Sequence, residues 1–252
     1  MRRDLLTTTV IWAAVTAISA LATYLWLDPF PTRGSQEAKV VDDAFMTLTY
    51  VAAPVFGFVV AVLAYSMLRF RSPGEPAEDG PPVFSGAAVP VAWLVITSAL
   101  AVALIVHPGL TGLFELRSDE PADMEVNVTG FRWAWIMEYV ESGVIVISPG
   151  DELVLPARRR IKFNVTAIEG DVLHSFWVPA FRTKIDAVPG QVHAMYVTIA
   201  GTSTPGDISY RVQCAELCGL FHGGMVMDVV VVEAAEFDRW LESKRTSAAR
   251  VQ

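Results

Sequence analysis

Residues 212–225 read VQCAELCGLFHGGM and bring two cysteines, a histidine and a methionine into one short stretch. The four donors are Cys214, Cys218, His222 and Met225. Runs that read as β-strands flank the stretch, so a single inter-strand loop would carry all four side chains. Because the chain has only two cysteines and four histidines, this clustering is not expected by chance. Sulfur and imidazole together point to a transition-metal site.

The sequence around this loop is typical of a β-domain. Short alternating or β-rich runs, separated by Gly, Pro and Asp, are EVNVTGF (125–131), FRWAWIMEYV (131–140), GVIVIS (143–148), DELVLP (151–156), RIKFNVTAI (160–168), VLHSFWV (172–178), VHAMYVTIA (192–200), ISYRVQ (208–213) and MVMDVVVVE (225–233). Their regular spacing predicts a sandwich or barrel, the size of a single Greek-key domain. His174 lies at the edge of the sixth run, where a Greek key can bring it beside the cysteine loop.

Three kinds of site remain open for these donors. A disulfide between Cys214 and Cys218 suits an oxidising compartment but leaves His174, His222 and the methionine without a role. Structural zinc fits two Cys and two His, yet the cysteine spacing is not C-x2-C and a thioether is a poor zinc ligand. Thiolate, imidazole and a weak axial Met are typical of copper sites that transfer electrons. Two thiolates one turn apart can each bridge two metals, which favours a binuclear copper centre with both cysteines deprotonated.

Three long apolar runs precede the β-domain. Residues 5–27, 44–68 and 87–106 contain no Asp, Glu, Lys, Arg or His, and about 20 apolar residues cross the hydrocarbon core of a bilayer. Each run is therefore predicted to be a transmembrane helix, the last two spanning about 44–68 and 87–107. With no ionisable side chain inside, these helices hold no evident proton relay. They serve as anchors or as contacts for a larger membrane subunit.

Basic residues set the expected orientation. Arginines precede the first run and follow the second, at Arg2, Arg3, Arg69 and Arg71. The positive-inside rule places these ends in the cytoplasm, so residues 72–82 form a short inside connection. Everything from about His107 onward then lies outside, as expected for a multi-pass protein of a bacterial-type inner membrane.

The first apolar run has a second interpretation. Met1-Arg2-Arg3, the apolar stretch and Ala20-Leu21-Ala22 also resemble a signal peptide with a small-residue cleavage site. The run continues to Leu27, past such a cut, which favours a retained helix. Under either interpretation two helices follow and the β-domain lies outside.

Composition agrees with a membrane protein. Charged residues make up 18% of the chain, below the roughly 25% typical of soluble domains. The net charge of −8 and the lack of a basic run exclude an electrostatic site for nucleic acid. We expect four parts: a signal peptide or first transmembrane helix at 1–27, a helical hairpin at 28–110, the β-domain at 111–233, and a C-terminal helix and tail at 234–252. Phe237, Trp240 and Leu241 have the i, i+3, i+4 spacing of an amphipathic helix.

The donor pattern has a family likeness. His174 together with Cys214-x-Glu216-x-Cys218-x-x-x-His222-x-x-Met225 resembles the CuA site of the cytochrome c oxidase subunit II family, the copper-carrying subunits of haem-copper oxidases. KIDAVPG (184–190) is similar to that family's Lys-x-Asp-Ala-x-Pro-Gly turn, and GFRWAWIMEY (130–139) to its aromatic segment. The resemblance covers roughly residues 124–232 and the two-helix hairpin before them.

The resemblance implies a mixed membrane protein, with two or three N-terminal transmembrane helices followed by an all-β, cupredoxin-like Greek-key domain. It implies a binuclear CuA centre of two copper ions. In that centre two thiolates bridge the coppers, two imidazoles cap them, and a thioether and a backbone carbonyl are weak outer ligands; these are Cys214 and Cys218, His174 and His222, and Met225 and Glu216.

The resemblance also implies the function. The chain would be the subunit through which electrons enter a terminal oxidase, an oxidoreductase. Trp133 would accept electrons from cytochrome c, and the copper centre would pass them to haem in the catalytic subunit I, where oxygen is reduced to water. The Glu216 side chain would reach a magnesium ion at the boundary with that subunit. Without the family context, Trp133 and Trp135 could be strand core and Glu216 an exposed loop acid.

One departure keeps an alternative open. The family commonly has a Glu near the start of the second hairpin helix that helps to admit protons, yet residues 80–114 contain no carboxylate. Either the partner takes protons by another route, or the chain serves a related nitric oxide reductase. A non-redox membrane protein with a structural zinc or a disulfide is the alternative from a different class. The remaining histidines, His107 and His193, are interpreted as structural.

The distribution of charged side chains suggests how the protein would attract its electron donor. From residue 107 onward the chain carries 13 basic and 19 acidic side chains. Acids flank the aromatic and His174 segments at Glu138, Glu141, Asp151, Glu152, Glu169 and Asp171. We expect a negative surface that attracts a positively charged cytochrome c and that salt weakens, unless these acids form only a solvated face.

Overall fold

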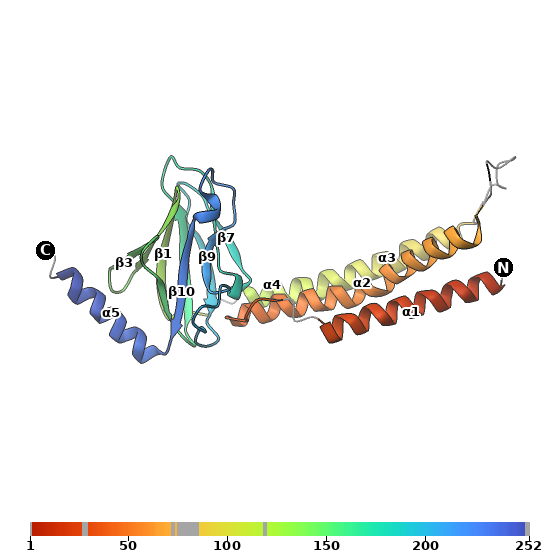
Figure 1. Ribbon diagram of the computed structural model, residues 1–252, viewed down its shortest axis with the longest axis horizontal. Helices are drawn as coiled ribbons and strands as arrows, with labels where there is room; N and C mark the ends of the chain where they lie inside the picture. The colour runs from red at the N-terminus through yellow and green to blue at the C-terminus, as the bar shows by residue number, and fades with distance from the viewer. Residues whose placement is uncertain (1, 27–29, 72–73, 75–85, 118–119, 250–252) are drawn as a thin grey trace. The chain divides into compact units, whose positions relative to one another are not determined.

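A computed structural model describes residues 2–26, 30–71, 74, 86–117 and 120–249 (Figure 1). The chain forms two compact units: Met1–Pro29 with Asp43–Phe114, and Phe30–Asp42 with Glu115–Gln252. The first unit is helical and the second is built on β-sheets. The short segment before residue 43, which sequence alone assigned to the helical hairpin, thus groups with the β-sheet unit.

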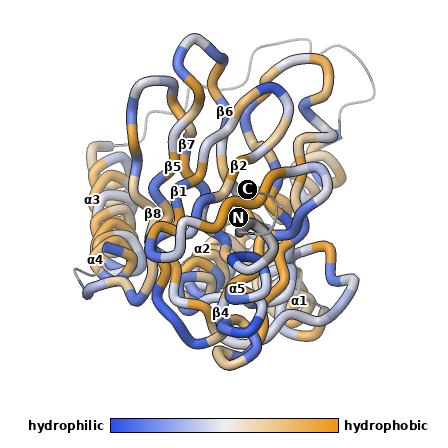
Figure 2. Tube along the Cα trace, turned by 90° about the vertical axis from the view of Figure 1, so that its left-hand side faces the viewer, coloured by the Kyte–Doolittle hydropathy of each residue, from blue (hydrophilic) through white to orange (hydrophobic). Residues whose placement is uncertain are grey.

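The helices follow the apolar runs. They are α1 (Arg2–Trp26), α2 (Gln36–Arg69) and α3 (Ala88–Leu104), the last continued by a π-helical turn (Ile105–Leu110) and α4 (Thr111–Leu116). Among the described residues, three helical segments are long and apolar enough to cross a membrane, which confirms the three predicted helices. Helix α3 is coloured mainly as hydrophobic in Figure 2 and has no buried residue. Except for Gly74, the predicted connection at 72–82 lies outside the described residues.

Helix α2 begins eight residues before the apolar run that predicted it. The hydroxyl of Ser35 accepts a hydrogen bond from the Ala38 amide at 3.0 Å, which satisfies a free donor at the helix start. Glu37 adds a negative charge in the first turn, where the helix dipole favours it. Hydropathy detects only the apolar part of such a helix, so the polar first two turns were missed.

Helix α1 packs against α2 inside the helical unit. The Trp12 indole N–H donates to the carbonyl of Pro54 at 2.7 Å, and the Tyr65 hydroxyl donates to Asp4 at 2.8 Å. Gly57 lies so close to α1 that a Cβ atom there would come within 2.6 Å of the Thr16 hydroxyl oxygen. Close approach at small residues is how membrane helices pack. Helix α1 therefore has the packing partner that the retained-helix alternative requires.

The β-sheet unit contains two five-stranded sheets (Figure 1). One has the order β3-β2-β1-β5-β8 and the other β4-β10-β9-β6-β7. The strands are β1 (Met124–Phe131), β2 (Ala134–Tyr139), β3 (Val144–Ile147), β4 (Leu153–Pro156), β5 (Arg160–Ala167), β6 (His174–Trp177), β7 (Lys184–Ala187), β8 (His193–Thr198), β9 (Arg211–Cys214) and β10 (Val226–Val232). Two sheets with a shared apolar core form the predicted sandwich.

Two details of the strand prediction were wrong. The run FRWAWIMEYV is not one strand, because Arg132 and Trp133 form the turn between β1 and β2. The segment KIDA, expected as part of a turn, is the edge strand β7 and pairs with β6 from His174↔Ala187 to Trp177↔Lys184. Lys184 and Asp186 are exposed and alternate with the less exposed Ile185 and Ala187, but a run of four residues is at the lower limit of a recognisable strand.

Aromatic side chains close the sandwich. The Tyr139 hydroxyl donates to the Val154 carbonyl at 2.8 Å and accepts from the Val154 amide at 3.0 Å, so it links one sheet to the other. Helix α5 (Ala234–Ala249) packs Phe237 and Trp240 on the Tyr139 ring, with centroids 6.0 and 5.3 Å away. The predicted C-terminal helix is confirmed, and its apolar face covers the core.

The segment Phe30–Asp42 is fixed to the β-sheet unit by buried charges. Arg182 donates from Nε to Asp42 at 2.8 Å, and these side chains are only 8% and 2% exposed. Arg33 also reaches Asp42, at 3.1 Å. The Glu37 carboxylate accepts from the Thr198 amide at 2.9 Å. Buried carboxylates of this kind are tolerated only when they are paired.

We expect Arg182→Met to lower the free energy of unfolding by about 3 kcal/mol, because it leaves Asp42 buried with only the half-exposed Arg33 as partner. Chemical unfolding followed by tryptophan fluorescence measures the change. The matched control is Glu233→Gln at the exposed Arg158–Glu233 pair, which is expected to cost less than about 1 kcal/mol. Equal losses in both variants would show that the buried pair has no special importance.

Candidate metal centre

The pairing of β6 with β9 brings the two donor segments together. Phe176 is opposite Cys214 in this antiparallel pair, so His174, at the start of β6, lies next to the last residue of β9. Gly130 in the facing sheet leaves room for the imidazole, since a Cβ atom there would come within 3.3 Å of the His174 ring. Met225 directly precedes β10. The expected single inter-strand loop is therefore the β9–β10 loop.

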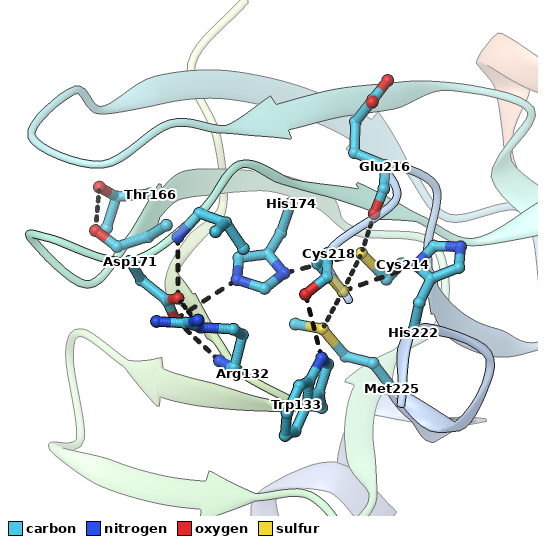
Figure 3. A network of polar contacts seen from close by, with 12 residues as sticks. Arg132, Trp133, Thr166, Asp171, His174, Cys214, Glu216, Cys218, His222 and Met225 are labelled. Atoms are coloured by element: carbon cyan, nitrogen blue, oxygen red, sulfur yellow. Dashed lines mark hydrogen bonds and ion pairs between the residues drawn. The ribbon is translucent and has the colours of Figure 1, made fainter. Parts of the chain in front are cut away.

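Five expected ligand side chains form one cluster (Figure 3), namely His174, Cys214, Cys218, His222 and Met225. Cys214 Sγ lies 3.8 Å from Cys218 Sγ and 3.8 Å from His174 Nδ1. Cys218 Sγ lies 3.5 Å from His222 Nδ1 and 3.8 Å from Met225 Sδ. The two imidazoles thus approach the thiols through the same ring nitrogen. Each imidazole approaches a different thiol.

These distances bear on the alternatives left open by the sequence. A separation of 3.8 Å between the sulfurs is far beyond the roughly 2.05 Å of a disulfide bond, and both cysteines are free. The ligand atoms of His174, Cys214 and Cys218 all lie within 4.8 Å of one another, a set that His222 does not join. One tetrahedral zinc would need all four donors around a single point. His174, Cys214 and Cys218 thus form one group of three donors, which His222 approaches through Cys218.

The Glu216 residue presents its backbone to the cluster. Its carbonyl oxygen lies 3.2 Å from Cys214 Sγ, whereas its carboxylate points away from the sulfurs (Figure 3). This is the geometry expected of a weak carbonyl ligand. The carboxylate remains available for a second role.

Burial sets the protonation of the candidate ligand side chains. Burial lowers the pKa of His174, although the nearby Asp171 carboxylate opposes this, so the imidazole is neutral, the form that binds metals. Burial, and then the neighbouring Cys214, raise the pKa of Cys218 to about 12. The Cys218 thiol is therefore protonated without a metal. Metal binding must displace that proton, as for other thiolate sites.

Trp133 lies in the β1–β2 turn and contacts the donor loop. Its indole N–H donates to the Cys218 carbonyl at 3.1 Å, and its ring meets Phe221 edge to face at 5.0 Å. Trp135 is different, because it is fully buried among core residues. The strand-core alternative therefore holds for Trp135, whereas Trp133 lies in a turn and is only partly buried against the core.

The sequence did not identify Asp171 as part of the site. Its carboxylate accepts from the Arg132 backbone amide at 2.8 Å and pairs with the Arg132 guanidinium. The same carboxylate lies 3.5 Å from His174 Nε2, a buried nitrogen with no hydrogen bond. Metal-binding histidines usually turn their other nitrogen toward such an acceptor. In the sequence, the feature that could have identified Asp171 is its position three residues before the candidate ligand His174.

Local contacts engage several of the acids that are expected to form a negative surface. Asp171 is paired as described, Glu138 accepts from Asn127 at 2.9 Å, and Asp151 pairs with Lys244 at 2.9 Å. Glu141 accepts from the backbone amide of Glu125. Several of the six acids are thus engaged in local contacts. His193, which bonds the Asp186 carbonyl at 2.9 Å, is not among the residues of the cluster, as expected.

We expect Gly219→Ala to cost about 1–3 kcal/mol of stability, because Gly219 has φ +114°, a conformation that L side chains rarely adopt. The added Cβ would also lie 3.4 Å from the Trp133 ring. Thermal unfolding and tryptophan fluorescence measure both effects. The control is Gly223→Ala, whose Cβ would meet nothing within 4 Å. If both variants behaved alike, the loop conformation would not depend on Gly219.

Comparisons with known proteins identify the family of the chain. A family profile described as "Cytochrome C oxidase subunit II, periplasmic domain" matches residues 142–234. The chain is 34% identical to a heme-copper oxidase subunit 2 of Aeropyrum pernix over 77% of this chain and 85% of that protein. It is 30% identical to a probable cytochrome c oxidase subunit 2 of Rickettsia bellii over 80% of this chain and 78% of that protein.

Among solved structures, the periplasmic domain of subunit II of cytochrome oxidase of Bradyrhizobium japonicum is 30% identical, with a TM-score of 0.45, and covers 52% of this chain and 99% of that chain. Neither of the two relatives named above is described as a nitric oxide reductase subunit. By sequence identity and coverage, the chain belongs to the cytochrome c oxidase subunit II family.

Proposed function

We propose that this chain is the subunit through which electrons enter a terminal oxidase, taking them from cytochrome c and passing them to haem in the catalytic subunit, where oxygen is reduced to water. The observation that carries the proposal is the pair of thiols 3.8 Å apart, each with its own imidazole within 3.8 Å. Membership of the oxidase family supports the same function.

The residues fit a binuclear copper centre. Cys214 and Cys218 would bridge two copper ions, His174 and His222 would bind one ion each, and Met225 would be a weak outer ligand. The Glu216 carbonyl, 3.2 Å from Cys214 Sγ, would be a second weak ligand. Such a copper pair, when bound, accepts and releases one electron at a time, and the bond-making chemistry belongs to the partner.

The frame of the site suits electron transfer because it limits ligand movement. His174 is fixed by a strand of the sandwich, and the β9–β10 loop is closed at both ends by strands of the same sheet. His174, Cys218 and Met225 are buried. Ligands held on rigid elements and shielded from water change little between charge states.

Trp133 offers a route from the surface to the cluster. The indole is half-buried, and its N–H donates directly to the backbone of the ligand Cys218. The indole does not need to gain or lose a proton, so its role would be to bring the electron of the donor close to the Cys218 sulfur. A donor docked over the indole would need no other protein group between it and the ligand loop.

The proposal extends to the neighbours of the centre. The outward-pointing Glu216 carboxylate would bind a magnesium ion at the boundary with the catalytic subunit. The β-sheet unit would face the extracytoplasmic side of a bacterial-type inner membrane, with the three apolar helices in lipid and against subunit I. The family profile, which describes a periplasmic domain, supports this orientation.

Copper analysis tests the proposal. We expect two coppers per chain, with an absorption and electron paramagnetic resonance spectrum of one electron shared by both ions. Cys218→Ser should abolish that spectrum, since one thiolate cannot make two bridges, whereas Met225→Leu should keep it and shift the potential. One zinc or no metal per chain would contradict the proposal.

Two variants separate the role of the Trp133 ring from the role of its N–H group. We expect Trp133→Ala to leave copper bound and to slow cytochrome c oxidation at least tenfold, because the route through the indole is lost. Trp133→Phe keeps an aromatic ring but lacks the N–H donor, so its rate should lie between those of the unchanged protein and of Trp133→Ala. Stopped-flow reduction of the copper centre measures the rate. Unchanged rates in both variants would place the docking point elsewhere.

A further inference from the structure

The surface beside Trp133 is apolar. Gly219 and Phe221 both contact the indole, with a Cβ position 3.4 Å from the ring and ring centroids 5.0 Å apart, and Leu220 lies between them in the chain. Leu220 and Phe221 are 84% and 58% exposed. We name Arg132, Trp133, Asp171 and residues 219–221 the Trp133 face. Large exposed apolar side chains at one place on a surface mark a site of interaction.

The charges of the Trp133 face cancel. Asp171 is bonded to both the backbone and the guanidinium of Arg132 (Figure 3), so the cation beside the indole neutralises the nearest acid. Glu138 lies four residues along β2 from Ala134, about 13 Å at the rise of a β-strand. Glu169 is an exposed acid in the loop that carries Asp171. The face therefore offers few unpaired acids to a ring of lysines.

We propose that the electron donor docks on the Trp133 face through apolar contact, and that this donor is a small cytochrome c whose exposed haem edge is ringed by uncharged, apolar side chains. The inference rests on the proposed function and names the partner of the same site. A neutral, apolar face matches a neutral, apolar rim, whereas a lysine ring would gain little there because the nearest acid, Asp171, is already paired with Arg132. The net negative charge of the chain acts from a distance, where salt screens it.

Salt dependence distinguishes the two kinds of donor. Steering between opposite charges raises association rates at low salt and loses this advantage as salt increases. For apolar docking, we expect the second-order rate of copper reduction to change less than about threefold between low and physiological ionic strength. For docking on an acidic ring, the same change should lower the rate tenfold or more.

The experiment uses the whole copper-loaded oxidase complex and stopped-flow reduction by two probes, a cytochrome c with a lysine-ringed haem edge and one with an uncharged haem edge. We expect the uncharged probe to react at least tenfold faster at physiological ionic strength. Leu220→Ser should slow it about tenfold at every ionic strength. The control is Ile208→Ser, a side chain of the same unit that is 76% exposed and outside the Trp133 face, which should change the rate less than twofold.

A variant that adds a negative charge to the Trp133 face completes the test. Leu220→Glu should slow the uncharged probe at all ionic strengths, because a carboxylate would be buried in an apolar contact. If instead the lysine-ringed probe were faster, lost rate with salt and gained rate from Leu220→Glu, the proposal would be overturned. A normal copper spectrum with that result would leave the proposed function standing, whereas absence of the copper spectrum would contradict both.

Discussion

The candidate centre depends on one piece of strand pairing. β6 and β9 are far apart in the sequence and adjacent in the sheet, with Phe176 opposite Cys214. This register alone places the His174 imidazole beside the first thiol. The β9–β10 loop then returns the second thiol, the second imidazole and the thioether to the same place. A slip of one residue would turn the imidazole to the other face of the sheet.

The rest of the domain holds this register in place. The Tyr139 hydroxyl links the two sheets, and helix α5 covers the aromatic core on one side. The Asp42–Arg182 pair fixes the segment Phe30–Asp42, which includes the start of α2, to the same unit. These contacts lie outside the donor cluster, yet they stabilise the frame on which its distances depend.

Local patterns in the sequence predicted much of this structure. The ligands Cys214, Cys218, His222 and Met225 could be found because they are close in sequence, and the helices because long apolar runs are unambiguous. What could not be predicted needed tertiary contacts. The edge strand β7 alternates over only four residues, which is too short a signal. The turn at Trp133 interrupts a run of strand-forming residues, and the pairing of Arg132 with Asp171 joins residues 39 positions apart. The acidic surface stays a prediction, since composition does not show which acids are paired, as Asp171 is with Arg132.

X-ray absorption at the copper edge of the purified, copper-loaded protein tests the central claim most directly. The account predicts sulfur and imidazole scatterers around each copper together with a short copper–copper contribution, because two shared thiolates hold the ions side by side. A spectrum with one isolated copper and no metal–metal contribution, or a sulfur-free shell, would contradict it.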